Sequence, residues 1–562
     1  MKRMLSLTLL LAALGSGAHA ATLAQNMPAG ALLTLESKNA GGAIDRLFGL
    51  VGQVAETVGA DSDSEMGDIS QTLAGFQQIL KGSLGQESAL GVFTVGAPGK
   101  PFALHVLAAS RTDDLSKELL SDMLSDKPGA KVGLYSFSRQ GDLFVGQSQG
   151  LVYMSSNKTL LMNYLGRLSG STAPRLLNSV AYTTPTAAKG TQELSFFVNF
   201  SAAAKVARSQ FSRFFLPRLL SPIVDAIDTL GQYSAGFTTT AAGLTGQSAH
   251  AVNSAGKDKP LSRMLTSTTN FSVQNIIPAS AETVKATACV PEGNAYAARW
   301  LTRIDLLDPV GFLTDSQLAS HLERSAQYLG NECAQVTLEG AQAAGFDAAN
   351  PLSTLDYSVT YQRVSDLDAA EAHMPEYTEA VNTALTGLAQ SLRDLVKNTD
   401  MSDLPDMGGM SELPSGAQAG ALAAALGSVD NLTDLIGGLK MVYAFRDGYL
   451  ITAFSQTALD AALDEETPVL AEDTDFKAAE LKAQGSAGWQ YARNADDVTE
   501  EQVMGVFANA LPEDLMDSDM GDIFKPVGSV LTDLINRYDG MTSQSAVSGN
   551  LIVSKSNIKF VW

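Results

Sequence analysis

Hydrophobic and polar positions recur in the same order in the two halves of this chain. The stretch from Leu450 to Leu463 runs from strand-like residues through a short polar turn into helical spacing, and Leu151 to Tyr164 follows the same order earlier. The hydroxyl and amide side chains of both turns are suited to cap the helix that follows. Because a repeat changes how every other segment is interpreted, we align the two halves on this unit.

The two halves also open alike. Pro28-Ala29 precedes a strand-like pattern over residues 31–37, and Pro278-Ala279 precedes a similar pattern over residues 282–289. Amphipathic helical spacing follows each strand, over about residues 42–58 and 294–307. These matches place the junction near residue 275. They predict a first repeat over residues 21–275 and a second over residues 276–562.

The second repeat has additional length before the shared unit. Apolar residues at helical spacing from Thr314 to Leu329 predict a helical insertion near residues 310–345. A stretch rich in Met, Gly, Pro and Ala predicts a flexible excursion near residues 400–427. We therefore assign most of the extra length to these two segments.

Strand-like and helical patterns alternate through both repeats. Alternating or β-branched runs predict strands, and they are followed by helical spacing over residues 113–124 and 375–396. The predicted strands include Leu90–Val95, Phe102–Ala108, Leu355–Gln362, Leu194–Phe200 and Gly488–Arg493, and strand pairs over Gly236–Val252 and Gly540–Ser554. The pattern predicts an α+β protein of two tandem homologous domains, each a mostly antiparallel sheet covered by helices.

This organisation resembles an exported bacterial domain-of-unknown-function family, number three-three-five-two. The resemblance lies in the Pro-Ala lead-in, the strand-turn-helix of the shared unit and the element from Leu177 to Tyr182 after it. It covers most of the chain after residue 20. It implies the duplicated α+β fold and an exported location, and it implies no catalytic residues.

The amino terminus has the order of a secretory signal peptide over residues 1–20. Lys2 and Arg3 precede an apolar run, and Ala18-His19-Ala20 ends the segment. We predict cleavage after Ala20 and a location in the periplasm or cell envelope. The apolar run is too short to span a bilayer, and no later stretch has the roughly 20 apolar residues that a spanning helix needs, so we expect no transmembrane span.

Composition narrows the classes of partner. The chain has 562 residues, 38 Lys and Arg against 60 Asp and Glu, and a net charge of −22. Nucleic acid is disfavoured as a partner, because phosphate binding needs a basic surface. The length predicts more than one domain.

Cys289 and Cys333 are the two cysteines of the chain. An oxidising compartment allows them to form a disulfide, and two separate buried thiols are the alternative. Closing this loop would contribute on the order of 4 kcal/mol in the chain-entropy model. A metal site on the two cysteines is disfavoured, because no histidine lies at ligand spacing.

Two serine motifs are weighed against simpler interpretations. Gly146 to Gly150 matches the G-x-S-x-G nucleophile elbow around Ser148, but strand-like residues continue on both sides, which favours a hairpin. Ser155 and Lys158 match S-x-x-K, but neither S-D-N nor K-T-G follows, and helix capping suffices. The four histidines after residue 20, His105, His250, His321 and His373, cannot be paired with a serine from sequence.

Two acidic clusters and the last residues of the chain have structural interpretations. Asp61, Asp63, Glu65 and Asp68 alternate like the start of a calcium loop, but Met66 stands where an EF-hand needs glycine. They are interpreted as a solvated loop with weak calcium binding as the alternative, like the cluster of Asp517, Asp519 and Asp522. Ile558, Phe560 and Trp562 alternate at the carboxy terminus, which predicts a final sheet strand.

A basic run interrupts the acidic chain. Its members are Lys205, Arg208, Arg213 and Arg218, and the corresponding second-repeat segment has Glu513 and Asp514. Because related elements often meet across a pseudo-two-fold axis, we hypothesise a polar contact between the repeats in which Arg213 or Arg218 lies beside Glu513 or Asp514.

These observations favour a non-catalytic extracytoplasmic protein of the cell envelope, a structural or interaction module. The first alternative is a periplasmic carrier with an apolar cleft between sheet and helices for a lipid or other hydrophobic ligand. The second is a serine hydrolase. The sequence identifies no catalytic, cofactor or metal site, and it leaves the partner, an envelope component or a hydrophobic ligand, and the oligomeric state open.

Overall fold

A computed structural model provides the structure of the chain. The described residues are 21–38, 41, 86–95, 103–111, 129–211, 217–256, 258–301, 316–341, 344, 352–398, 433, 435–493, 498–504, 532 and 535–561.

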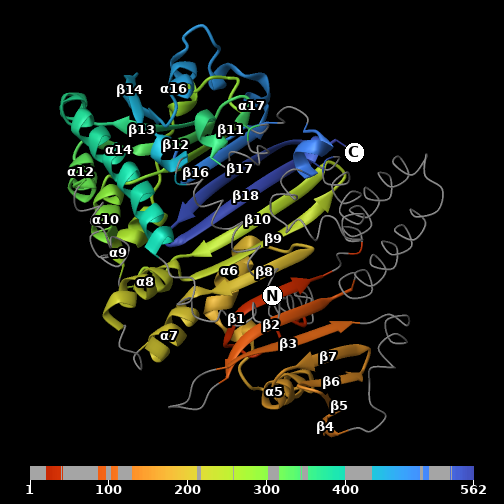
Figure 1. Cartoon of the computed structure of the whole chain (residues 1–562). Helices are drawn as coiled ribbons and strands as arrows, with labels where there is room; N and C mark the ends of the chain where they lie inside the picture. The colour runs from red at the N-terminus through yellow and green to blue at the C-terminus, as the bar shows by residue number, and fades with distance from the viewer. Residues whose placement is uncertain are drawn as a thin grey trace, which may run out of the picture.

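The strands of the first half form a continuous antiparallel array (Figure 1). They pair in the order β4–β5–β6–β7–β3–β2–β1–β8–β9–β10. Their bounds are β1 Ala31–Ser37, β2 Ser88–Val95, β3 Ala103–Arg111, β4 Ala130–Val132, β5 Tyr135–Gln140, β6 Leu143–Ser148, β7 Leu151–Ser155, β8 Leu194–Asn199, β9 Gln232–Thr240 and β10 Gly243–Ala251.

The second half repeats this order of pairing. Its strands pair in the order β14–β15–β13–β12–β11–β16–β17–β18. This order matches β6–β7–β3–β2–β1–β8–β9–β10 of the first half, strand by strand. Their bounds are β11 Thr283–Ala288, β12 Leu329–Thr337, β13 Ser358–Val364, β14 Val442–Arg446, β15 Tyr449–Ala453, β16 Gly488–Arg493, β17 Tyr538–Ser548 and β18 Leu551–Phe560. The shared unit found in the sequence is β7 with its following helix and β15 with its own.

The two halves join edge to edge into one sheet, because β10 pairs with β18 along nine residues. These strands hold the same place in their halves, and Gln247 of β10 lies opposite Lys555 of β18. The β9–β10 turn after Thr240 corresponds to the β17–β18 turn after Ser548, so Gln247 and Lys555 are equivalent positions. A residue that pairs with its own counterpart marks a pseudo-two-fold axis. The division of domains at residue 275 stays a prediction, since the halves share one sheet.

Helices cover the inner face of the sheet in each half. In the first half they are α5 (Lys158–Leu168) and α6 (Val180–Lys189), and in the second α16 (Gln456–Leu463) and α17 (Thr474–Ala478). Asn157 caps α5 and Ser455 caps α16 through their side chains, as the polar turns predicted. Alternate strand residues point to these helices and form two large cores, one around Leu107, Tyr153 and Phe197, the other around Val284, Tyr361 and Trp489. The predicted α+β class with an antiparallel sheet is confirmed.

A second group of helices gathers at one end of the strands (Figure 1). They contact one another in chain order, from the first half into the second. The group consists of α7 Phe200–Phe211, α8 Pro217–Leu230, α9 Lys259–Leu265, α10 Glu292–Leu301, α12 Leu318–Ser325 and α14 Leu367–Asn398. No helix in the described part of the chain has the length and hydropathy of a membrane-spanning segment.

A glutamate at an equivalent position anchors the lead-in segment of each half; Glu332 is buried and Glu87 is partly exposed. The Leu23 backbone N–H donates to Glu87 Oε1 at 2.6 Å, and the Val273 N–H donates to Glu332 Oε1 at 2.7 Å. The lead-in prolines form equivalent bridges, Pro28 with Arg175 and Pro278 with Val469. The same contacts therefore hold the lead-in segment in both halves.

The structure corrects two boundaries. The helical insertion expected near residues 310–345 is helical in α12, but from Leu329 it continues as strand β12, whose alternating buried residues complete the core. The helix predicted from Pro375 begins eight residues earlier, at Leu367. The longest additional stretch of the second half lies between β13 and β14, over residues 365–441, where the first half has residues 112–142. Several predictions lie outside the described residues: the signal peptide, the helices over 42–58 and 113–124, the excursion near 400–427, and both acidic clusters.

Candidate functional site

The outer face of the sheet is apolar in the first half. One residue from each of six adjacent strands forms a line across this face, through direct cross-strand pairs. We call this line the apolar row; its members are Met154, Ala108, Leu90, Leu35, Phe196 and Ala235. Directly paired residues share one face of a sheet. The side chains of Met154, Leu35 and Phe196 remain 38%, 38% and 39% exposed.

More apolar side chains extend the row on the same face. Leu33 lies two residues from Leu35 and pairs with Val92 and Val198, while Val92 in turn pairs with Val106. Val106 is 39% exposed. Contiguous exposed apolar surface of this kind marks interaction sites more often than scattered single residues do.

The equivalent line in the second half is polar. The same cross-strand pairs connect one residue from each of the corresponding strands. We call it the polar row; its members are Thr452, Thr360, Gln335, Lys285, Gln490 and Ser543. Thus every member of the apolar row has a polar counterpart, although the backbone pairing is the same.

The inner face shows the opposite contrast. Glu36 and Ser195, the neighbours of Leu35 and Phe196, point inward and pair with each other on β1 and β8. They line a cavity of about 310 Å³ against α6, together with Lys189. Their second-half counterparts are Ala286 and Trp489, which pair directly in the core.

The cavity against α6 holds a buried lysine beside a serine. Lys189 Nζ donates to Ser195 Oγ at 2.8 Å and to the Gly190 carbonyl at 3.1 Å. Burial lowers the pKa of Lys189 to about 8; Glu36 opposes this shift, and Lys38 adds to it. Glu36 is 8% exposed, and within the described residues its Oε1 accepts no hydrogen bond. The cavity therefore holds a lysine and a glutamate beside apolar lining residues such as Tyr182 and Phe197, and it differs from the apolar cleft expected of a lipid carrier.

The two serine motifs hold structural positions. Ser148 ends β6, and Gln149 and Gly150 form the tight turn into β7 with φ of 57° and 71°, so the glycine motif is a hairpin. Ser148 Oγ accepts from the Ser136 backbone N–H at 3.2 Å. Ser155 Oγ donates to the Val106 carbonyl at 2.8 Å. Neither serine has a described contact with a histidine or a lysine that could activate it.

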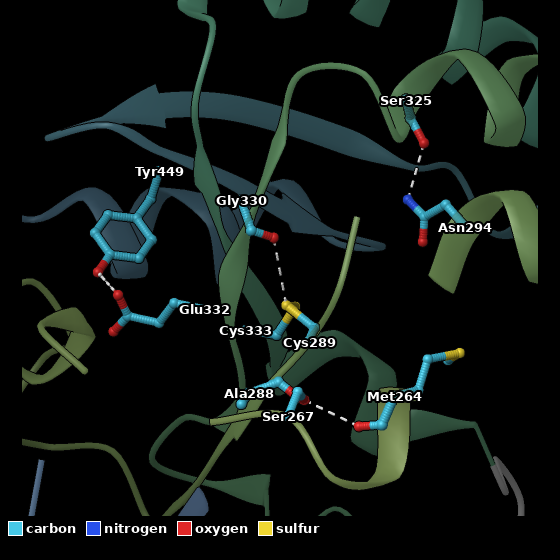
Figure 2. Close-up of a disulfide and its surroundings, with 10 residues drawn as sticks. All are labelled: Met264, Ser267, Ala288, Cys289, Asn294, Ser325, Gly330, Glu332, Cys333 and Tyr449. Atoms are coloured by element: carbon cyan, nitrogen blue, oxygen red, sulfur yellow. Dashed lines mark hydrogen bonds between the residues drawn. A yellow bond between two sulfur atoms is a disulfide. The ribbon is translucent and has the colours of Figure 1, made fainter. Parts of the chain in front are cut away.

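The predicted disulfide between Cys289 and Cys333 is present (Figure 2). The Cα atoms are 5.9 Å apart, within the range that a disulfide requires. Cys333 lies on β12, and Cys289 follows β11, so the bridge joins neighbouring strands. Figure 2 also shows Tyr449 donating to Glu332, at 2.6 Å.

The basic run is partly resolved into local pairs. Arg208 contacts Asp225 at 2.8 Å and Asp228 at 2.9 Å, which ties α7 to α8 within the first half. Arg213, Glu513 and Asp514 lie outside the described residues, and the Arg218 side chain is not described. The polar contact between Arg213 or Arg218 and Glu513 or Asp514 therefore stays a hypothesis. The described contacts between the halves include the β10–β18 pairing and the packing of α9 against α10.

Sequence reasoning missed a cluster of histidines. His321 on α12 and His373 on α14 approach to 2.9 Å between Nδ1 and Nε2, and Glu376 lies beside them. His373 is fully buried, and burial lowers its pKa to about 4, with further lowering from Arg324 and His321. The spacing of His373 and Glu376, three residues apart on one helix, was the available signal; the position of His321 depends on tertiary packing.

Comparisons with known proteins add little to this geometry. No family model and no curated protein matches the chain. Crystal forms I and III of a protein designated TP0453 are similar at 12% identity with a TM-score of 0.23; they cover 45% and 43% of this chain, and 90% and 84% of their own. A likeness of this size carries no functional argument. Membership of family three-three-five-two stays a prediction.

Proposed function

We propose that this protein is a non-catalytic, exported interaction module of the cell envelope that binds an apolar partner through the outer face of its first half. The apolar row carries the proposal. It is a continuous line of hydrophobic side chains, and the duplicated half has polar residues at every equivalent position. Backbone pairing alone thus does not require an apolar outer face.

The dimensions of the row suit an apolar helix face. Six strands at about 4.8 Å spacing make a line roughly 24 Å long. An α-helix rises about 1.5 Å per residue, so a partner helix of about 16 residues matches that length. Amphipathic helices bind such surfaces through side chains three and four residues apart. The proposed partner is therefore an envelope protein that presents an amphipathic helix.

Export is supported by two independent features. The first is the charged, apolar and small-residue order of residues 1–20. The second is the Cys289–Cys333 disulfide, because disulfides persist in oxidising compartments. Amino-terminal sequencing of protein from the envelope fraction should begin at Ala21; a chain that still begins at Met1 would contradict this part of the proposal.

The carrier for a hydrophobic ligand is the second candidate. The apolar row favours it only as an open surface, because the cavity between the sheet and α6 holds a buried lysine and a glutamate. A third candidate, the serine hydrolase, has less support, since Ser148 and Ser155 serve in a hairpin and a strand end.

The double variant Leu35→Lys with Phe196→Gln tests the proposal, because it installs the residues of the polar row in the first half. The probe is a neutral 16-residue peptide with one leucine face and one glutamine face. We expect the wild type to bind it and the variant to lose at least tenfold in affinity, by fluorescence anisotropy. The matched control, Thr360→Ala with Gln490→Ala in the polar row, should bind like the wild type.

Two outcomes separate the candidates. Equal binding by the wild type and the Leu35→Lys, Phe196→Gln variant, with both folded by circular dichroism, would overturn the interaction surface. Native mass spectrometry and lipid extraction of the purified wild type address the carrier. A co-purifying hydrophobe that the double variant lacks would favour the carrier over the protein-binding module.

A further inference from the structure

We propose that His321, His373 and Glu376 form a binding site for a divalent transition-metal ion of the zinc class. The three side chains each offer one ligand atom, and these atoms all lie within 4.8 Å of one another. Two imidazoles and a carboxylate are a common ligand set for zinc in proteins. The site lies far along the chain from the apolar row, and it does not depend on the proposed function.

Helix packing brings the three ligands together. His373 and Glu376 lie three residues apart on α14, so both point to the same side of the helix. His321 comes from α12, which packs against α14. The two imidazole rings lie nearly parallel, with an angle of 18° between their planes. A metal ion here would clamp two helices of the end group.

The spacing of the nitrogens suits a shared ion. His321 Nδ1 and His373 Nε2 are 2.9 Å apart and compete for one proton between them. Two nitrogens bound tetrahedrally to zinc at about 2.05 Å would be roughly 3.3 Å apart. The pair needs to open by about 0.4 Å for the ion to replace the shared proton. Rotation of the exposed Glu376 side chain supplies the third ligand.

Tyr328 orients the site by contacting His373 rather than the ion. Its hydroxyl lies 3.0 Å from His373 Nδ1, the nitrogen that faces away from His321. When Nδ1–H donates to this oxygen, the Nε2 lone pair is free to bind the ion. Partners of this kind orient metal-binding histidines, and their loss typically costs about 10- to 100-fold in affinity.

Arg324 opposes the metal ion and supplies a sharp test. Its Nη1 contacts Glu376 Oε2 at 2.9 Å, so the guanidinium both repels a cation and occupies the carboxylate. The two side chains are 51% and 60% exposed, which leaves them room to separate. Removal of Arg324 should therefore strengthen metal binding, whereas removal of a ligand should weaken it.

The experiment uses the full mature protein, freed of metal by chelation and titrated with Zn²⁺ by isothermal titration calorimetry. We expect one ion per chain, and a loss of at least tenfold in affinity for His321→Ala and for Glu376→Gln. Tyr328→Phe should lose about tenfold. Arg324→Gln should gain severalfold, and His105→Ala, a histidine outside the cluster, should equal the wild type.

A spectroscopic measurement distinguishes binding at this site from binding elsewhere on the surface and from misfolding. Co²⁺ should give visible absorption bands in the wild type that His321→Ala lacks, with both proteins showing the same circular dichroism. The inference is overturned if the wild type binds no Zn²⁺, or if His321→Ala and His105→Ala bind it alike. Equal affinity for Glu376→Gln and the wild type would overturn the three-ligand site.

Discussion

The two halves of this protein pair their strands alike but differ in polarity at equivalent positions of the central strands. In the second half Trp489 and Ala286 point into the core, while Lys285 and Gln490 point outward. In the first half the positions equivalent to Trp489 and Ala286 are Ser195 and Glu36, and Leu35 and Phe196 point outward. Main-chain hydrogen bonds preserve the fold through this reversal, since they do not depend on which side chain faces the core.

At these positions the second half is arranged for stability and the first half for the binding that we propose. The second half follows, at these positions, the usual rule for a sheet with one solvated side, apolar inward and polar outward. The first half leaves large apolar side chains half-exposed and places a lysine and a glutamate inside, where burial of charge costs free energy. Such a departure from the stable pattern is expected where a surface serves a partner.

Variants at the inward-facing positions should give the largest difference in stability between the two halves. Trp489 is 3% exposed and packs against Phe271 and Phe476. We expect Trp489→Ala to lower the free energy of unfolding by roughly 3 to 5 kcal/mol, the range for truncation of a buried aromatic residue. The equivalent change in the first half, Ser195→Ala, should cost about 2 kcal/mol, since it removes one hydrogen bond from the buried Lys189.

Urea denaturation followed by circular dichroism measures both variants. A change in slope together with the midpoint would indicate that one half unfolds before the other. Equal losses for Trp489→Ala and Ser195→Ala would contradict the larger contribution to stability that we assign to the inward position of the second half.

Glu332 and Glu87 hold equivalent positions in the two halves and allow a second comparison of stability. Glu332 is 2% exposed and accepts from the Ser272 and Val273 backbone N–H groups and from the Tyr449 hydroxyl. Glu332→Gln should cost about 2 kcal/mol, because charge-assisted bonds are lost in a buried site. Glu87 accepts from the Leu23 N–H and pairs with Arg111, whose side chain is 51% exposed.

We expect Glu87→Gln to cost about 1 kcal/mol, since an exposed ion pair contributes little. The same denaturation experiment measures it beside Glu332→Gln. If Glu87→Gln is the more destabilising of the two, the lead-in of the first half is the better anchored, and the burial of Glu332 does not decide the cost.

Sequence patterns predicted the positions of the strands along the chain better than the direction of their side chains. Alternation in Ala31–Ser37 identifies a strand, and the lead-in prolines identify its counterpart in Thr283–Ala288. An assumption that leucines face inward would turn β1 over, because Leu33 and Leu35 face outward and Glu36 faces the core. Register comes from the pairing with β8 and β2, which are distant in sequence.

The candidate sites escaped sequence reasoning for the same physical reason. The apolar row takes one residue from each of six strands, and no two of its members lie near each other in the chain. His321 and His373 belong to separate helices. The Cys289–Cys333 bridge was predictable, because the chain has two cysteines and hence one possible pairing.

The smallest expected effect is a difference in pH dependence produced by the charged cavity of the first half. Burial lowers the pKa of Lys189 to about 8 in the folded protein, from an ordinary value of 10.5. Between these values the unfolded chain binds more protons than the folded protein, so stability rises with pH. The rise from about pH 7 to about pH 9 should amount to roughly 1 kcal/mol. Lys189→Met should remove it.

Urea denaturation at the two pH values measures this rise, with Lys285→Met as the matched control. Lys285 is an exposed member of the polar row, so its replacement should leave the rise intact. An unchanged rise in Lys189→Met would show that the lysine reaches water in the folded state. The inner face of the first half would then hold a solvated charge, and its contrast with the closed core around Trp489 would rest on packing rather than on buried charge.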